Sequence, residues 1–392
     1  MRVLLIWELG AQLGHFGTLL PIADALAADG HEVVFALKDL HHAYPLIGAR
    51  YPYFQAPIRA NQKQLACHYE SYADILLHAG FDNADALGGL VSAWRSLYVQ
   101  LQPDWVIYNH APAALFSARG LHFKKTCVGA GFSIPPDGEC FPRFRYWQPD
   151  TENGNAHRQN SHQQAMANGN LTARRLGMPT LQHLPEIFRG AAQKLTTFPQ
   201  LDHYPRRTTA DYIGPIGGLV QGQPFEKRSG ERWIFCYLWA RHRGSLDLLK
   251  ALADIQDFKI LAVVPDLSDQ IPIQQHYKNL TVTRLPINLG TLSHWAELIV
   301  CHANHGTLAL ALSQGVPSVN RPVTLEQTML AKRVEEAGAG IILQSGITPS
   351  DAARQITDAV RQQTGKTGAC IIQATHQASA FNTRDELLAA LI

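Results

Sequence analysis

Hydrophobic and polar residues alternate along the chain in blocks that repeat a strand, a loop and a helix. Residues 3–7 form a short apolar run, and a glycine-containing loop follows. Apolar residues then recur with helical spacing between residues 19 and 26, and a second apolar run occupies residues 32–36. This strand–helix–strand unit predicts a parallel sheet covered by helices. Its first loop lies at the carboxyl end of a strand, where such sheets bind ligands.

The same alternation of predicted strands and helices continues through the first half of the chain, with one interruption. Between residues 135 and 170, Pro, Gly, Asn, Gln and His become frequent, so we expect a long, partly mobile excursion with one helix at residues 159–167. The other expected elements of this half are helices at residues 73–101 and 113–119 and strands at residues 105–108, 125–129, 196–198 and 212–216.

The second half restarts the pattern after a polar joint. The expected strands are residues 233–238, 259–264, 280–283, 297–300, 318–322 and 341–343, and the expected helices include residues 245–254, 289–295, 308–312, 331–337 and 348–363. Two consecutive α/β halves predict two facing, Rossmann-like doubly wound domains with a central cleft. The expected divisions are a first domain at residues 1–220, a linker at 221–232, a second domain at 233–375 and a final helix within 376–392.

Composition limits the classes of function. A length of 392 residues favours two domains, and a formal net charge of +2 without basic runs gives no reason to expect a nucleic-acid partner. The six cysteines form no CxxC pair, which favours a reduced, cytoplasmic protein. No apolar run approaches the length of a transmembrane helix, and the N-terminal run is too short for a signal peptide.

The strongest chemical signal lies at residues 300–307. A buried strand passes through a short turn into a helix, and such a helix start offers free backbone N–H groups and a positive dipole end to an anion, most often a phosphate. His302, Asn304, His305 and Thr307 add side-chain donors there. A metal site on the two histidines is disfavoured, because no acidic or cysteine ligand has a fitting spacing nearby.

Several short motifs, in order, resemble the UDP-glycosyltransferase superfamily, which includes bacterial antibiotic and macrolide glycosyltransferases. The signature His-Gly-Gly-x-Gly-Thr corresponds to His-Ala-Asn-His-Gly-Thr at residues 302–307. The remaining landmarks are Gly14-His15, Gly315-Val316-Pro317, Glu326-Gln327 and Gly338-Ala339-Gly340. The resemblance covers both halves of the chain and implies the two-domain glycosyltransferase B fold.

The resemblance also implies an activity. It would be inverting, metal-independent transfer of a sugar (a hexosyl group) from a UDP- or dTDP-linked donor to a hydroxyl or amine of a small lipophilic or phenolic acceptor. His15 would be the general base, and no cofactor is expected beyond the nucleotide-sugar co-substrate. The oligomeric state would be monomer or homodimer. The residues implied in holding the diphosphate and the sugar are His302, Asn304, His305, Gly306, Thr307, Glu326 and Gln327.

Three positions depart from the family pattern. Asn109 stands where many members place an aspartate that orients the base. Either His15 would act with less stabilisation of its protonated form, or Asp104 or Glu8 would take the place of the missing aspartate, or the acceptor would itself be acidic, as a phenol is. Leu310 replaces the glutamate that binds the nucleotide ribose, so the sequence does not decide whether the donor is a UDP- or a dTDP-sugar. Asn304 replaces a glycine, either as a further phosphate contact or as a residue in the left-handed turn conformation.

Other expectations are secondary. Arg241 or Arg243 would add positive charge to the donor site, and Phe144 and Trp147 would line an acceptor pocket. The final helix would pack back toward the first domain, as it does in the family. Two rival functions remain: a nucleotide-sugar epimerase of the same fold, and a non-catalytic binding or activator protein, which Asn109 and Leu310 would favour.

Overall fold

The structure, a computed structural model, divides into two compact units. It describes residues 1–10, 14–59, 69–216, 222–268, 277–376 and 383–392. The first unit comprises Met1–Thr196, Arg206–Ile213 and Thr383–Ile392, and the second comprises Thr197–Pro205 and Gly214–Asn382. Residues 197–205, placed in the first half by the sequence pattern, and residues 222–232, expected as a linker, therefore group with the second unit. Residue 221 of that linker lies outside the described residues.

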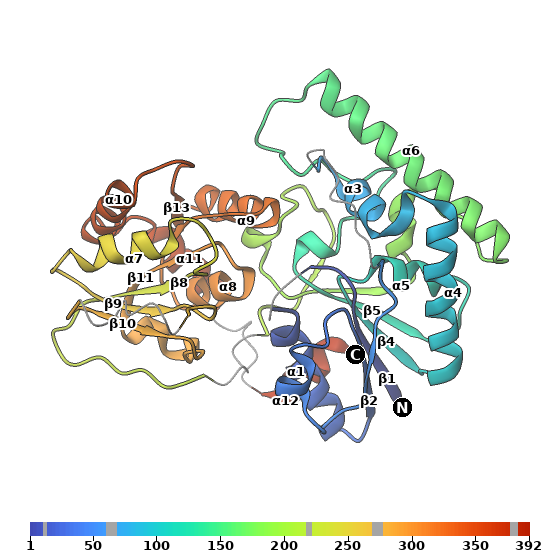
Figure 1. Cartoon of the computed structure of the whole chain (residues 1–392), viewed down its shortest axis with the longest axis horizontal. Coiled ribbons are helices and arrows are strands. Elements are labelled where there is room, and N and C mark those ends of the chain that lie inside the picture. Colours follow the sequence, from blue (N-terminus) through green and yellow to red (C-terminus); the bar gives the residue numbers. More distant parts are fainter. Residues whose placement is uncertain (11–13, 60–68, 217–221, 269–276, 377–382) are drawn as a thin grey trace. The chain divides into compact units, whose positions relative to one another are not determined.

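A parallel sheet forms the centre of the first unit (Figure 1). Its seven strands lie in the order β3-β2-β1-β4-β5-β6-β7, and every neighbouring pair is parallel. Their bounds are β1 Arg2–Trp7, β2 Glu32–Leu37, β3 Tyr53–Gln55, β4 Trp105–Asn109, β5 Lys124–Gly129, β6 Ala192–Leu195 and β7 Asp211–Tyr212. The central strands β1 and β4 are buried almost throughout, as expected for a sheet with helices on both faces.

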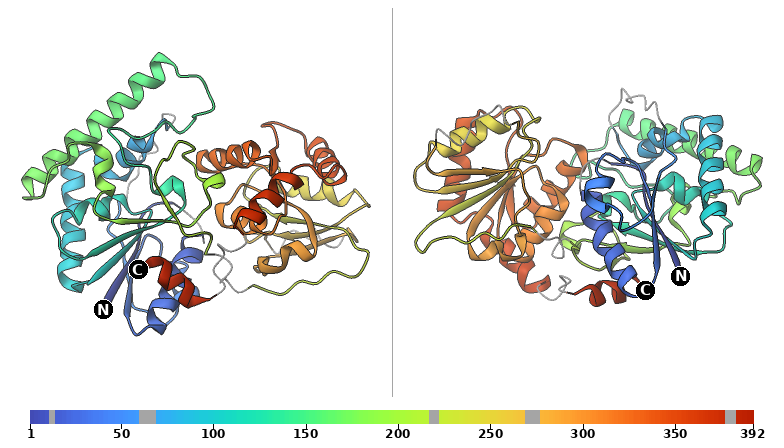
Figure 2. Two further views of the ribbon diagram at one scale, coloured as in Figure 1. Left: turned by 180° about the vertical axis from the view of Figure 1, so that it is seen from behind. Right: turned by 60° about the horizontal axis from the view of Figure 1, so that its bottom comes forward.

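Helices cover both faces of this sheet, with α1 and α12 on one side and α4 on the other (Figures 1 and 2). The C-terminal helix α12 packs against α1, with Leu387 and Leu391 buried. The helices of the unit are α1 Gly14–Ala28, α2 Ala43–Ile47, α3 Tyr72–Leu76, α4 Ala84–Leu101, α5 Pro112–Ser117, α6 Glu152–Arg175 and α12 Arg384–Leu391.

The expectation of a long irregular excursion at residues 135–170 is wrong for its second part. Helix α6 runs for 24 residues where the sequence pattern predicted only residues 159–167. Thr151 begins it by accepting a hydrogen bond from the backbone N–H of Gly154 at 3.1 Å. The helix packs on α3 and α4 through small residues, so its sequence lacks the stripe of large apolar residues by which an amphipathic helix is predicted. These small residues are Ser161, Ala165, Gly169, Thr172 and Ala173.

The second unit has its own parallel sheet, in the order β10-β9-β8-β11-β12-β13. The strands are β8 Trp233–Tyr237, β9 Lys259–Val263, β10 Leu280–Thr283, β11 Ala296–Cys301, β12 Ser318–Asn320 and β13 Gly340–Ile342. Alternate residues of a strand enter two different cores: Phe235 and Ile299 pack into one, and Cys236 and Val300 into the other. This division follows from the two-residue period of a strand buried on both faces.

Each core of the second unit is completed by helices from one side of the sheet. Helices α8, α9 and α11 supply residues to the first core, and α7 and α10 to the second. Their bounds are α7 Ser245–Ala253, α8 His305–Ser313, α9 Leu325–Glu336, α10 Pro349–Arg361 and α11 Lys366–His376. The helix expected at residues 289–295 is a short 3₁₀ helix, Leu289–His294.

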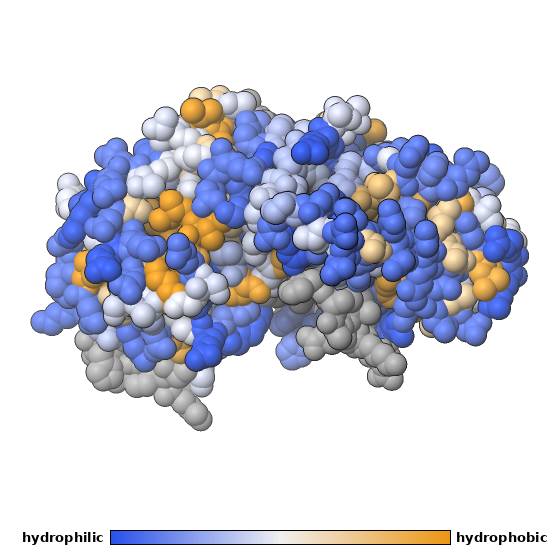
Figure 3. Space-filling model, turned by 90° about the horizontal axis from the view of Figure 1, so that it is seen from above, coloured by the Kyte–Doolittle hydropathy of each residue, from blue (hydrophilic) through white to orange (hydrophobic). Residues whose placement is uncertain are grey.

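The described residues contain no helix that is long and apolar enough to cross a membrane. The face of the molecule drawn in Figure 3 is mainly hydrophilic, and its hydrophobic residues form separate groups.

Two glycines give a matched test of this packing. A Cβ at Gly368 of α11 would lie 2.2 Å from the carbonyl oxygen of Gly338, whereas a Cβ at Gly89 of α4 would meet nothing within 4 Å. We expect Gly368→Ala to lower the free energy of unfolding by about 1–3 kcal/mol through overpacking. Gly89→Ala should raise it by roughly 0.5–1 kcal/mol, because alanine is the better helix former. Urea denaturation measures both, and equal effects would contradict the close approach at Gly368.

Candidate active site

Both sheets reverse their strand order next to the first strand of the unit. In the first unit the chain places β2 and β3 on one side of β1 and then continues with β4 on the other side. In the second unit β9 and β10 lie on one side of β8, and β11 lies on the other. Loops that follow the two strands at such a switch point diverge and leave a crevice for a ligand. The residues predicted from the sequence fall at these two places.

His15 and Asn109 meet at the switch point of the first unit. The Nδ1 atom of His15 lies 2.5 Å from Oδ1 of Asn109. The Nδ2 atom of the same amide donates to the carbonyl oxygen of Val128 at 2.8 Å, which fixes the amide so that its oxygen faces the histidine. Nδ1 of His15 must then carry the ring proton, and Nε2 is left with its lone pair. The pair therefore presents a base at Nε2.

The surroundings of His15 hold the ring in its neutral form. Its ring stacks on Trp7 at a centroid distance of 4.8 Å, and a Cβ at Gly10, whose φ is +89°, would lie 2.3 Å from Nε2. Burial lowers the pKa of His15 to about 4; the Asn109 hydrogen bond opposes this shift, and the charge of Lys38 adds to it. Gly10 thus supplies both the turn conformation and the space that the ring occupies.

Neither acidic residue considered as a substitute for the missing aspartate reaches His15. Asp104 accepts a hydrogen bond from the backbone N–H of Arg2, at the opposite end of the sheet. Glu8 is buried, and its Oε2 accepts from the backbone N–H groups of Ala113 and Ala114, both at 3.0 Å. Burial raises the pKa of Glu8 to about 8, against the opposing effect of those two hydrogen bonds. Glu8 therefore stabilises the start of α5 and is protonated at neutral pH.

An aromatic cluster continues from this site. The ring of His110, whose centroid is 6.3 Å from that of His15, lies 6.0 Å from Phe132 and 6.2 Å from Tyr72. Phe144 is fully buried and stacks on Phe132 at 5.3 Å, so this residue of the expected acceptor pocket does join the cluster. Trp147 contacts Tyr146 edge-on and is only partly buried.

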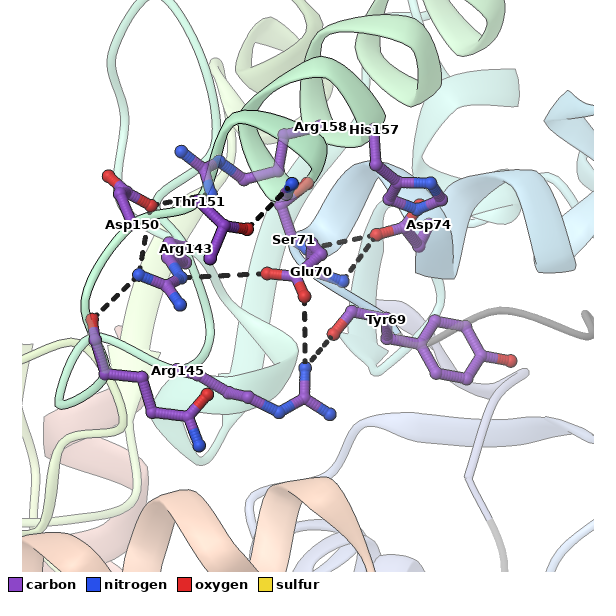
Figure 4. A network of polar contacts seen from close by, with 12 residues as sticks. Tyr69, Glu70, Ser71, Asp74, Arg143, Arg145, Asp150, Thr151, His157 and Arg158 are labelled. Atoms are coloured by element: carbon purple, nitrogen blue, oxygen red, sulfur yellow. Dashed lines mark hydrogen bonds and ion pairs between the residues drawn. The ribbon is translucent and has the colours of Figure 1, made fainter.

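A polar network fixes the segment that carries Phe144 (Figure 4). The backbone N–H of Phe144 donates to the carbonyl oxygen of Glu70 at 2.8 Å, and the Glu70 carboxylate lies 3.6 Å from both Arg143 and Arg145. Asp74 accepts hydrogen bonds from the side chains of His157 and Ser161, both on α6, at 2.9 and 2.6 Å. The start of α3, the segment after residue 140 and the long helix α6 are thereby tied together around the cluster.

At the switch point of the second unit, the predicted anion site is a helix start. Ala303, with φ of +59°, takes the left-handed turn conformation, whereas Asn304 is extended and precedes α8. The turn conformation suggested for Asn304 therefore belongs to its neighbour. The Oδ1 atom of Asn304 and Nε2 of His305 are buried and, within the described part of the chain, have no hydrogen-bond partner. Gly306 and Thr307 follow in the first turn of α8, where backbone N–H groups are free.

Both ring nitrogens of His302 form hydrogen bonds within the protein. Its Nδ1 donates to the carbonyl oxygen of Arg321 at 2.9 Å, and its Nε2 accepts from the backbone N–H of Trp239 at 3.3 Å. Burial lowers the pKa of His302 to about 4, against the opposing effect of the Arg321 hydrogen bond. The neutral ring joins the loops after β8, β11 and β12.

The other predicted donor residues lie at the start of α9 and on α8. Glu326 is exposed in the first turn of α9. The Oε1 atom of Gln327 accepts from the backbone N–H groups of Val323 and Thr324, so this side chain closes a capping box. Leu310 is buried on α8, where it offers no hydrogen bond to a ribose.

The sequence pattern did not single out two residues of the loop after β8. Trp239 is buried and His242 partly buried, and their atoms Nε1 and Nε2 have no hydrogen-bond partner among the residues described. Arg241, expected as a source of positive charge, stacks on the Trp239 ring and lies 3.8 Å from Asp266. The signal available in the sequence was the run Trp-Ala-Arg-His-Arg-Gly directly after a buried strand.

Metal ligands do not gather in the part of the chain that is described. No group of three or more His, Cys, Asp or Glu side chains there has the arrangement of a metal site.

Comparison with known proteins identifies the fold. No protein-family model and no curated protein matches the chain. Among solved structures, the calicheamicin glycosyltransferase CalG4 matches 100% of this chain with 98% of its own, at 16% identity and a TM-score of 0.72. The glycosyltransferase VinC in complex with dTDP matches with the same coverage, at 17% identity and a TM-score of 0.71.

A third match is the spinosyn rhamnosyltransferase SpnG in complex with spinosyn aglycone. It covers 100% of both chains at 17% identity, with a TM-score of 0.64. The predicted fold class is confirmed: the chain has the two-domain α/β fold of these glycosyltransferases.

The Asn109 contact predicts a response of the His15 pKa. In Asn109→Asp a carboxylate would replace the amide oxygen beside Nδ1 and stabilise the imidazolium, so the pKa of His15 should rise above its value of about 4. NMR titration of the His15 ring protons in both proteins measures the shift. An unchanged or lower pKa in the variant would contradict the contact.

Glu8 predicts a pH dependence of stability. Its pKa is raised from 4.5 to about 8 in the folded protein, so the folded state binds the extra proton and stability falls as pH rises from about 4.5 to 8. Glu8→Gln keeps an acceptor for Ala113 and Ala114 and carries no charge. We expect the variant to be more stable than the wild type at pH 8 by on the order of a few kcal/mol, and not at pH 4.5. Denaturant unfolding at both pH values measures this difference, and a pH-independent difference would contradict the assignment.

Proposed function

We propose that the protein is an inverting, metal-independent glycosyltransferase. It moves a sugar from a nucleoside diphosphate sugar, bound by the second unit, to a hydroxyl of a small lipophilic or phenolic acceptor, bound by the first unit. The observation that carries the proposal is the His15–Asn109–Val128 chain of hydrogen bonds, because it leaves a neutral imidazole with a free lone pair at a ligand-binding switch point.

His15 acts as the general base. Its Nε2 takes the proton of the acceptor hydroxyl while the acceptor oxygen attacks the anomeric carbon. The bond from that carbon to the diphosphate oxygen breaks, and the nucleoside diphosphate leaves with the electron pair. Asn109 orients the ring through Nδ1 but adds no negative charge, so the imidazolium that forms receives less stabilisation than beside a carboxylate. A phenolic hydroxyl suits this base, because it gives up its proton more readily than an alcohol.

The donor binds at the start of α8. Free backbone N–H groups at Gly306 and Thr307, the helix dipole and the unpartnered His305 Nε2 stabilise the charge that develops on the leaving diphosphate. Glu326 and the amide nitrogen of Gln327 contact the sugar hydroxyls. Leu310 provides no acceptor for a 2′-hydroxyl, so dTDP, which lacks that group, loses nothing relative to UDP at this position. The dTDP complex of VinC and the fold it shares with this chain support a dTDP-linked donor.

The acceptor binds against the aromatic cluster around His110. The buried rings of Tyr72, Phe132 and Phe144 make the surroundings of His110, next to the base, apolar. The complex of SpnG with spinosyn aglycone, together with the shared fold, supports a small-molecule aglycone as the acceptor.

The direct test compares His15→Asn with wild type. Asparagine keeps a polar side chain at residue 15 but supplies no base, so turnover with a dTDP- or UDP-sugar and a phenolic acceptor should fall by roughly 10²- to 10⁴-fold. Affinity for the nucleoside diphosphate should stay within about twofold. His41→Asn, which changes an exposed histidine after β2, serves as the control and should retain full turnover. Donor binding without turnover in wild type across a broad acceptor panel would favour the non-catalytic binding protein instead.

A further inference from the structure

The loop that joins β8 to α7 carries polar groups without partners beside the proposed donor site. Nε1 of Trp239 and Nε2 of His242 are buried, and neither has a hydrogen-bond partner among the described residues. A buried polar atom left unpaired costs about 1–3 kcal/mol, so a ligand that pairs with these two atoms would recover that cost. Two of them in one short loop, at the carboxyl end of the strand next to β11, place that ligand at the switch point.

The charge around His242 favours an anion. Arg321 donates to Oγ of Ser245 at 3.3 Å and to the carbonyl oxygen of Arg243, so its guanidinium lies beside the same loop. The charges of Arg241 and Arg321 both act on His242, and Asp266 is the acidic residue that opposes them. The Asp266 carboxylate is hydrogen-bonded to the same loop: it accepts from the backbone N–H groups of Ala240 and Arg241 at 2.6 and 3.1 Å.

His302 lacks the free donor that a diphosphate contact would need. Both of its ring nitrogens bond to backbone groups, and Nε2 accepts a hydrogen bond there, so it has no proton to offer. The ring of His242 packs edge-on against that of His302, with centroids 4.7 Å apart and planes at 79°. His302 therefore sets the position of the His242 ring and of the backbone at Trp239.

We propose that His242 contacts the diphosphate of the donor directly through Nε2, and that His302 is a positioning residue that holds the loop carrying His242. This inference rests on the proposed function and adds a donor-binding residue to it. A ring nitrogen without a protein partner is free to carry the proton that a phosphate oxygen accepts. The loop after β8 and the start of α8 then bind the diphosphate from adjacent strands.

Two substitutions at residue 242 separate a ligand contact from packing. His242→Leu keeps an apolar side chain against His302 but removes the donor, whereas His242→Gln retains an amide donor close to the position of Nε2. Calorimetric titration of the full chain with UDP and with dTDP measures the affinity. We expect His242→Leu to weaken binding by ~10- to 100-fold and His242→Gln by no more than ~3-fold. His294→Leu, an exposed histidine of the same unit, is the control and should bind as wild type does.

Inorganic pyrophosphate, used to displace the nucleotide, tests which part of the donor is contacted. Its affinity should fall in His242→Leu by the same factor as that of the nucleotides, because the lost contact is to the diphosphate. A nucleotide loss without a pyrophosphate loss would overturn the diphosphate assignment.

The positioning role of His302 is tested by a double-mutant cycle. His302→Asn retains a donor toward the Arg321 carbonyl but loses the contact at Trp239, so it should weaken nucleotide binding in an otherwise wild-type chain. In a chain that already carries His242→Leu, His302→Asn should add little further loss, because His302 acts through His242. Fully additive losses would overturn the positioning role.

The outcomes also separate this inference from the proposed function. Wild-type binding of a nucleoside diphosphate, with unchanged affinity in His242→Leu, would overturn the role of His242 alone. Failure of the wild type to bind UDP, dTDP or any other nucleoside diphosphate would overturn the proposed function and this inference together.

Discussion

The reversal of strand order beside the first strand of each sheet is the constraint on which both candidate sites depend. A parallel sheet needs crossover helices, and where successive crossovers go to opposite faces the loops at the carboxyl edge separate. In the first unit this happens between β1 and β4, which carry the residues around His15 and Asn109. In the second it happens between β8 and β11, which lead to the His242 loop and to α8.

The two candidate sites differ in charge: the first is kept neutral, and the second is positive. In the first unit, burial keeps His15 neutral and Glu8 protonated at neutral pH, and an amide stands where a carboxylate would bury a charge. In the second unit, Arg321 lies beside the loop of His242, and unpaired polar atoms of Asn304 and His305 lie at the start of α8. The proposed transfer from a nucleotide sugar would use the first as a neutral base for the acceptor hydroxyl and the second as a positive site for the diphosphate.

The sequence predicted most strands of both sheets, because apolar runs and glycine turns are local signals. It missed β3, and it placed a strand at residues 196–198, where β6 has already ended at Leu195. His15 and Asn109, which it singled out, do meet: His15 lies at the start of α1 and Asn109 at the end of β4. The strand-to-helix turn that it predicted at residues 300–307 is present between β11 and α8. It failed at α6, whose buried side is made of small and polar residues that look like a loop. It also suggested the left-handed turn for Asn304, whereas Ala303 takes that conformation. It did not predict the hydrogen-bond partners of side chains: both ring nitrogens of His302 bond to backbone groups. Such partners depend on residues far away in the chain, which no local pattern contains.

The central claim is that a neutral His15, oriented by Asn109, takes the acceptor proton. The most direct measurement is the pH dependence of kcat/KM for sugar transfer to an acceptor that does not titrate between pH 3 and 8. Because the pKa of His15 is lowered to about 4, we expect the rate to stay constant from pH 7 down to about pH 5 and to fall only near pH 4. A fall centred at pH 6.5, the ordinary pKa of histidine, or a profile unchanged in His15→Asn, would contradict the account.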